Sequence, residues 1–297
     1  MGINNGAAHL LVKTGLIEYV KQQGEGRILT LGRQTMSIRT ERQKSELIMA
    51  NENIRHSSLN LNDYCENLLY DLGATSIESL DYSDFEGANH ILNLNTSFEN
   101  SKNAKHLKES FDLILDYGTS EHVFQPAQSI ANSIYMLKTG GLLNLVLPIS
   151  GWLEHGFYQF SPIFFRSLDS DFLELKRLYI FEPYKTPLKI WDGMKIINRP
   201  LYQSLNGRFS SFAIYEKKPN FNEKRFLSSI QQGVYASAWK RFTSSKDNNS
   251  DALNEGGIRT RQFRIRRKII PWLAKYRFFQ RYMMYRAQST LNSISKL

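Results

Sequence analysis

The chain has 297 residues, of which 41% are hydrophobic and 22% are charged, a composition typical of a globular protein with one sizeable core. Its least polar stretch, residues 140–153, is too short to span a bilayer, and the first residues lack the basic start and long apolar run of a secretory signal. Cys65 is the only cysteine, so an internal disulfide and a cysteine zinc site are excluded. We expect a cytoplasmic protein.

The net charge of +10 belongs to the C-terminal end of the chain. Residues 256–297 contain eleven Lys or Arg and no Asp or Glu, so removing these charges leaves residues 1–255 at −1. A polar stretch rich in Ser, Asn and Gly precedes this end and has too little apolar surface to fold alone. The sequence therefore predicts a domain at residues 1–242, a linker at 243–257 and a basic tail at 258–297.

Short apolar runs alternate with helical patterns through the first part of the chain. The runs that predict strands are residues 27–32, 76–81, 90–94, 111–116, 142–148, 172–180 and 211–215. The patterns that predict helices are residues 40–50, 61–72 and 124–137. This alternation predicts an α/β fold with a doubly wound, mostly parallel sheet.

Ligands bind such sheets beyond the carboxyl ends of the strands, near the point where the strand order reverses. The residues that stand there in this sequence, just after or at the end of a predicted strand, are Gly32, Asp81, Asn93 and Asp116. We therefore expect these four residues to lie at a ligand site.

Residues 111–141 combine FDLI, EHV and LKTGG, and they resemble the fourth and fifth strand region of class I S-adenosylmethionine-dependent methyltransferases. Residues 79–95 are similar to the second and third strands of that family. Over residues 27–217 the chain looks like a methyltransferase of type 11, and more narrowly like a subgroup that shares DYGTSEHVF and HGFYQFSP. The resemblance implies a Rossmann-like methyltransferase fold and S-adenosylmethionine as the cofactor.

The resemblance also implies cofactor contacts. Asp81 would accept hydrogen bonds from the two ribose hydroxyls, for which a carboxylate offers two acceptor oxygens. Asn93 would contact the adenine amine, and Asp116 would lie near the methionine part of the cofactor. Each has a local alternative, because Asp favours turns and Asn can cap the end of a strand.

The first strand departs from the family, which has an acid and three alternating glycines there. In RILTLGRQTM, Thr30 stands at the acid, Gly32 at the first glycine, and Gln34 and Met36 at the other two. Glycine lets the backbone approach the cofactor closely. Either this loop takes another path around the ligand, or the domain is degenerate and serves as a binding or interaction module.

Three residues are candidates for catalysis: Glu121, His122 and His155. Glu121 and His122 are expected to open a helix, where the helix dipole alone would favour Glu, and His122 is either a proton acceptor or a structural histidine. His155 begins the polar HGFYQFSP loop, where its imidazole would accept a proton from a substrate or merely hydrogen-bond the loop. Some quinone O-methyltransferases of this fold hold a divalent cation with a Glu-His pair and further acids. No second Glu or His follows here at suitable spacing, so we expect no metal site.

In the tail, apolar residues recur at helical spacing, opposite a cationic face. They are Ile265, Ile269, Trp272, Tyr276, Phe279 and Met283, and Pro271 should kink the helix. This pattern is typical of a helix that lies in an anionic membrane interface. Docking onto the domain or a second subunit is the alternative, and nucleic-acid binding is a third interpretation that no recognised motif accompanies.

We therefore expect transfer of a methyl group from S-adenosylmethionine to a small-molecule, sugar or lipid-linked acceptor, by a protein peripheral at the inner membrane. The non-catalytic alternative is a degenerate domain that acts as an interaction module. A third alternative is RNA methylation with the tail as an RNA-binding arm.

Overall fold

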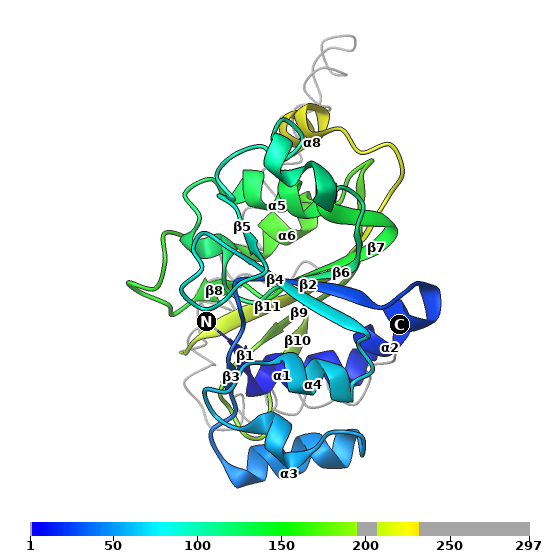
Figure 1. The fold of residues 1–297 in the computed structure, drawn as a ribbon. Coiled ribbons are helices and arrows are strands. Elements are labelled where there is room, and N and C mark those ends of the chain that lie inside the picture. Colours follow the sequence, from blue (N-terminus) through cyan, green and yellow to red (C-terminus); the bar gives the residue numbers. More distant parts are fainter. Residues whose placement is uncertain (1, 195–206, 232–297) are drawn as a thin grey trace, which may run out of the picture.

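The computed structural model describes residues 2–194 and 207–231, which form a central sheet with helices on both faces (Figure 1). The linker at 243–257 and the tail at 258–297 lie outside the described residues. Their predicted roles stay predictions.

The strands supply one large sheet and one short pair. They are β1 (Ile3–Asn4), β2 (Arg27–Leu31), β3 (Met36–Ser37), β4 (Ser76–Asp81), β5 (His90–Ile91), β6 (Phe111–Asp116), β7 (Leu137–Leu145), β8 (Pro148–Ser150), β9 (Leu173–Phe181), β10 (Ile190–Asp192) and β11 (Phe209–Lys217).

The helices occupy the connections. The α-helices are α1 (Asn5–Thr14), α2 (Leu16–Gln23), α3 (Glu41–Ala50), α4 (Glu66–Asp71), α5 (Pro126–Met136), α6 (Pro162–Ser167) and α8 (Glu223–Ser229). The described residues also form the short 3₁₀ helices η1 (His56–Leu59), η2 (Lys102–Leu107) and η3 (Ser120–His122).

The large sheet has the order β10-β9-β11-β7-β6-β2-β4-β5, and β8 pairs with β11 beside this path. Strands β5, β4, β2, β6 and β7 pair in parallel, whereas β11 is antiparallel to both β7 and β9. From β2 the chain moves outward through β4 to β5, and then returns to β6 on the other side of β2. The strand order therefore reverses at β2 and β6, which is where a doubly wound sheet opens a crevice at its carboxyl edge.

Alternate side chains of the central strands enter two separate cores. Ile28 and Leu113 pack with the helices α1 to α4, whereas Leu29 and Ile114 pack with α5, α6 and α8. Figure 1 shows these two sets of helices on opposite faces of the sheet. Because both faces are covered, the central strands are continuous apolar runs, as expected of a parallel sheet. The predicted doubly wound α/β fold is confirmed.

Several predicted elements have other boundaries in the structure; the strand predicted at 142–148, for example, spans Leu137–Leu145. Three of the differences have a local cause. The helix predicted at 61–72 begins only at Glu66, because the preceding residues form a turn in which Asn62 has a φ of 69°. The strand predicted at 90–94 stops at Ile91, where the chain enters a turn. The helix predicted at 124–137 begins at Pro126, whose fixed φ suits a first helical position.

Within the described part of the chain, none of the helices combines the length and the apolar character that a membrane crossing requires.

Candidate functional site

Gly32, Asp81 and Thr119 come together at the carboxyl edge of β2, β4 and β6. Gly32 has a φ of 67°, and its amide donates to the carbonyl of Leu80 at 2.7 Å. A Cβ on Gly32 would lie 3.0 Å from Thr119 Oγ1 and 3.8 Å from Asp81 Oδ2. This conformation favours glycine, so a side-chain-free turn lies beside the carboxylate of Asp81.

The loop after Gly32 follows a path unlike a strand-to-helix glycine turn. The Gln34 side chain is 2% exposed and donates to the carbonyl of Leu31 and, at 3.4 Å, to that of Gly32. Met36 is buried and pairs with Ile3 through the parallel strands β3 and β1. The second and third glycine positions are therefore filled by a folded-back amide and a core side chain.

Arg33 ties the loops after β2 and β4 together. Its Nε lies 2.7 Å from Glu66 Oε1, and its guanidinium stacks 3.8 Å from the centre of the Tyr64 ring. It also donates to the carbonyl of Glu86 at 2.9 Å. These contacts hold the 82–89 loop against the first turn of α4.

Asp81 and Asn93 both engage their own neighbouring backbone. Asp81 Oδ1 accepts from the amide of Tyr82 at 2.6 Å, while Oδ2 faces Gly32. Asn93 Oδ1 accepts from the amide of Asn95 at 2.9 Å and from its side chain at 3.0 Å. Asn93 thus caps the turn that ends β5, and its contact with adenine stays a prediction.

Asp116 lies beneath the site. Its side chain is 0% exposed, and Oδ1 accepts from the amides of Thr119 at 2.9 Å and Ser120 at 3.3 Å. Burial raises the pKa of Asp116, against the lowering effect of these hydrogen bonds. The structure gives this carboxylate a local function, which is to hold the turn that carries Glu121.

The rest of the DYGTSEH segment anchors this turn. Tyr117 Oη donates to Asn144 Oδ1 at 2.6 Å. Thr119 Oγ1 donates to the carbonyl of Leu31, and Ser120 Oγ is 2.8 Å from Ser129 Oγ. The next two residues, Glu121 and His122, are thereby fixed relative to β2 and α5.

Glu121 is a buried carboxylate without a hydrogen-bond partner among the described residues. It is 0% exposed, and neither Oε1 nor Oε2 accepts a hydrogen bond from any described residue. Burial, with a contribution from nearby Asp116, raises the pKa of Glu121 to about 8. The prediction that Glu121 and His122 open the helix α5 is wrong, because both residues belong to the separate 3₁₀ helix η3. Stabilisation by the dipole of α5 therefore does not account for this Glu.

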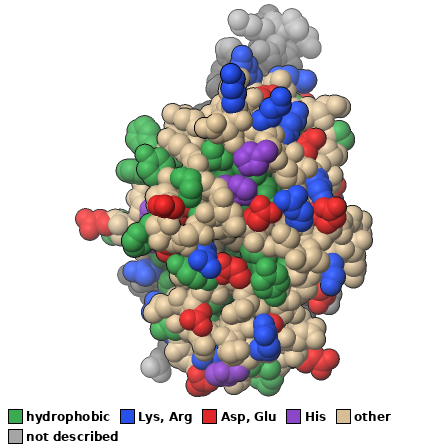
Figure 2. Space-filling view, viewed as in Figure 1, with side chains coloured by type: hydrophobic (Ala, Val, Ile, Leu, Met, Phe, Trp, Pro, Cys, Tyr) green, Lys and Arg blue, Asp and Glu red, His purple; other side chains and the backbone are tan. Residues whose placement is uncertain are grey.

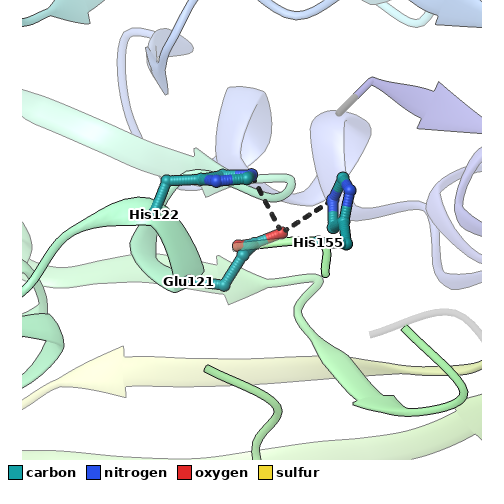
Figure 3. A group of neighbouring side chains, drawn as sticks. All are labelled: Glu121, His122 and His155. Atoms are coloured by element: carbon teal, nitrogen blue, oxygen red, sulfur yellow. Dashed lines mark ion pairs between the residues drawn. The ribbon is translucent and has the colours of Figure 1, made fainter. Parts of the chain in front are cut away.

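His122 and His155 converge on Glu121 from different loops (Figure 3). Their Nε2 atoms lie 4.0 Å and 3.8 Å from Glu121 Oε1, and their rings pack edge to face with centroids 5.1 Å apart. Burial lowers the pKa of both imidazoles. The three residues predicted to be catalytic are therefore neighbours in space.

The HGFYQFSP loop is built onto Glu121. The amides of Phe157 and Tyr158 donate to the Glu121 carbonyl at 2.7 Å and 3.3 Å. Gly156 has a φ of 78°, and a Cβ there would lie 2.9 Å from the same carbonyl oxygen. Gln159 Oε1 accepts from the amide of Trp152, which closes the loop. The glycine thus permits the close approach that brings His155 to Glu121.

The expectation of no metal site depended on finding no further ligand after Glu121-His122. His155 supplies one from the loop after β8, and one ligand atom from each of the three residues lies within 4.8 Å of the others. Spacing along the chain could not show this meeting. The signal available in the sequence was the joint presence of the DYGTSEH and HGFYQFSP motifs.

Large apolar side chains are exposed on the loops that follow β4, β6 and β8. They are Tyr82, Phe85, Phe124, Leu153 and Phe157. Two of them, Phe124 and Phe157, contact each other with ring centroids 5.9 Å apart. In Figure 2 hydrophobic side chains gather along the left edge of the view, the side on which β8 lies in Figure 1. We call these five exposed side chains the apolar rim of the candidate site.

No protein-family model matches this sequence, and no curated protein matches it. Among solved structures, the chain is similar to the CMeT domain of the citrinin polyketide synthase, with 14% identity and a TM-score of 0.33 over 65% of this chain and 47% of that one. The chain thus spans about half the length of that protein. It is also similar to a putative methyltransferase from Bacillus halodurans (12% identity, TM-score 0.30, 65% and 93% covered). An arsenic(III) S-adenosylmethionine methyltransferase from Chlamydomonas reinhardtii is 13% identical, with a TM-score of 0.29 and 65% and 64% covered.

Proposed function

We propose that the chain transfers a methyl group from S-adenosylmethionine to a small-molecule, sugar or lipid-linked acceptor. The observation that carries this proposal is the adjacency of two features at one sheet edge. The Gly32 turn faces Asp81, and Thr119 links it to the segment that presents Glu121. A cofactor cradle and a cluster of proton-accepting groups would thus stand side by side.

Asp81 and Gly32 are placed to bind the ribose of the cofactor. Asp81 Oδ2 is directed toward the bare Gly32 backbone, so it would accept hydrogen bonds from the ribose hydroxyls. When bound, S-adenosylmethionine supplies an activated methyl group. The acceptor would be held at Glu121, His122 and His155, because methyl transfer needs in-line positioning and a group that takes the acceptor's proton.

The apolar rim supports an acceptor with an apolar part. Tyr82, Phe85, Phe124 and Phe157 are solvent-exposed aromatic rings, and exposed apolar patches commonly mark binding surfaces. Together with the basic tail, they favour an acceptor embedded in or bound to an anionic membrane over a fully polar metabolite.

Calorimetric titration with S-adenosylmethionine and S-adenosylhomocysteine, in the presence of EDTA, tests the proposal. We expect saturable binding of both at one site per chain. Absence of binding would exclude methyl transfer. It would favour the second candidate, a methyltransferase-like interaction module. This candidate is supported by the buried Gln34, which stands where the methyltransferase family has a glycine.

His155→Ala should lower turnover by roughly 10²–10⁴-fold, the range for loss of a proton-transfer group. Its affinity for S-adenosylmethionine should not change, since His155 lies on the acceptor side of the site. Transfer of the labelled methyl group to the acceptor measures the first quantity and calorimetry the second. A wild-type rate in the folded variant would leave His155 only a structural part in the loop.

A further inference from the structure

The cluster of Glu121, His122 and His155 contains buried polar atoms whose hydrogen-bonding capacity is unused. Both carboxylate oxygens of Glu121 and Nε2 of His155 have no hydrogen-bond partner among the described residues. An unpaired polar group in a protein interior is costly, because it loses its hydrogen bonds with water and gains none in return. Buried polar groups are otherwise almost always satisfied. Two of these atoms, Glu121 Oε1 and His155 Nε2, lie 3.8 Å apart and face each other. A single bound ion would satisfy both.

We propose that Glu121, His122 and His155 form a binding site for a divalent transition-metal ion of the zinc type. Two imidazole nitrogens and one carboxylate oxygen make up a ligand set that zinc takes in catalytic sites. Imidazole ligands favour zinc, cobalt and iron over magnesium and calcium, which prefer oxygen. The ion would bind the same three residues at which the proposed function places the acceptor, but its binding does not depend on S-adenosylmethionine.

The distances fit such an ion. Glu121 Oε1 is 3.8 Å from His155 Nε2 and 4.0 Å from His122 Nε2. Ligands about 2.0–2.2 Å from a tetrahedral ion would lie roughly 3.3–3.6 Å apart, so each pair needs to close by only about half an ångström. Both pairs are too far apart for a hydrogen bond. The side chains therefore converge as ion pairs without hydrogen-bonding one another (Figure 3).

The backbone around the cluster is already fixed, which lowers the cost of ordering the ligands. Glu121 is held between the Asp116 turn and the amides of Phe157 and Tyr158. His155 packs against the Trp152 ring, with centroids 5.1 Å apart. The two loops that carry the ligands are thus joined through Glu121, and neighbours that hold metal ligands in place raise metal affinity.

One side of the cluster faces solvent. The side chains of His122 and His155 are 46% and 33% exposed, whereas Glu121 is fully covered. Three protein ligands with an accessible fourth position are typical of a catalytic zinc site. The fourth ligand would then be a water or a substrate oxygen on the exposed side of the cluster.

The test uses the tag-free full-length protein after treatment with EDTA and dialysis. Titration with Zn²⁺ followed by calorimetry and elemental analysis should give one ion per chain. Co²⁺ should produce the visible absorption of a four- or five-coordinate ion, and Mg²⁺ should give no heat at the same concentration. Zn²⁺ should also raise the melting temperature, since an ion that binds only the folded state stabilises it.

Variants locate the ion. His122→Ala and His155→Ala should each weaken zinc binding by more than the roughly 10–100-fold lost with an outer-shell partner. Glu121→Gln should lose the zinc-induced rise in melting temperature, yet melt in EDTA no lower than the wild type, because it removes a buried carboxylate that lacks a hydrogen-bond partner among the described residues. The matched control is the surface pair Glu41 and His56, in which His56 Nε2 lies 2.7 Å from Glu41 Oε2. Glu41→Gln and His56→Ala should bind zinc like the wild type.

Two results would overturn the site. The first is the absence of saturable zinc binding by the wild type. The second is a double variant, His122→Ala with His155→Ala, that binds zinc as tightly as the wild type does. Because these measurements contain no S-adenosylmethionine, they succeed or fail separately from the calorimetric test of methyl transfer.

Discussion

At the scale of single residues, the Asp81 carboxylate and the bare Gly32 turn form the side of the site at which we propose that the cofactor binds. If S-adenosylmethionine binds there, Asp81→Ala should weaken it by roughly 1.5–3 kcal/mol, the contribution of a hydrogen bond to a charged group. Calorimetry measures the change. Asp84→Ala is the matched control, because Asp84 is an exposed acid in the same loop. Equal affinity in the two variants would remove Asp81 from the site.

Gly156 is the residue on which the approach of His155 to Glu121 depends. Gly156→Ala forces an L side chain into a φ of 78° and brings a Cβ within 2.9 Å of the Glu121 carbonyl oxygen. We expect a loss of stability of about 1–3 kcal/mol from strain and weaker zinc binding, measured by chemical unfolding and calorimetry.

Gly140→Ala separates these two effects. Gly140 has a φ of 81°, and nothing lies within 4 Å of its potential Cβ. The control variant should therefore show the backbone strain alone and bind zinc like the wild type. If Gly156→Ala also retains full zinc affinity, the close approach of the loop does not position His155.

At the scale of elements, α1 carries a buried histidine that couples stability to pH. His9 is 7% exposed, and burial lowers its pKa, although the Asn5 carbonyl at 2.9 Å and nearby Glu46 oppose the shift. Its folded-state pKa thus lies below the unfolded value of about 6.5. Near and below pH 6.5 the unfolded chain binds the proton first, so stability should fall as the pH falls.

His9→Asn should reduce this loss, because Asn can donate to the Asn5 carbonyl but does not titrate. Urea unfolding of both proteins at pH 7.5 and pH 5.5 gives the two differences in the free energy of unfolding. The difference should be smaller in the variant, whatever its absolute stability. An identical pH dependence in the two proteins would show that the pKa of His9 is the same in the folded and unfolded states.

At the scale of the whole molecule, the basic tail is predicted to attach the protein to membranes. Residues 259–290 should bind vesicles that contain anionic lipid, since each cation near such a surface contributes about 1 kcal/mol. Vesicle binding should fall steeply as the salt concentration rises. The binding that persists at high salt should come from the apolar face, and the double variant Trp272→Ser, Phe279→Ser should weaken it. Sedimentation with vesicles at low and high salt measures both terms.

Truncation after Lys246 is the control for this prediction. The core of the described chain closes with β11 and α8, which end before residue 230, so the shortened protein should remain folded and lose vesicle binding. Unfolding on truncation would assign the apolar stripe of the tail to the core. A full-length protein that ignores anionic vesicles at low salt would contradict the membrane interpretation.

The sequence by itself determined the layers of this protein. The buried strand β6 is mostly apolar and helix α5 has a helical period, so the type of each follows from local patterns. The polar residues at the strand ends could be named for the same reason, because parallel strands share one carboxyl edge. Boundaries such as the start of α4 depended on a left-handed turn at Asn62 that no periodicity reveals.

Only the tertiary structure decided the chemistry of the site. Glu121 could be placed near His122 from the sequence, but its burial, its unpaired oxygens and its meeting with His155 arise from the packing of one loop against another. Likewise, Gln34 folds back and Met36 enters a strand with Ile3 because the N-terminal segment pairs beside the glycine loop. Periodicity encodes which face of an element is buried, whereas contacts between distant loops depend on the three-dimensional path that joins them.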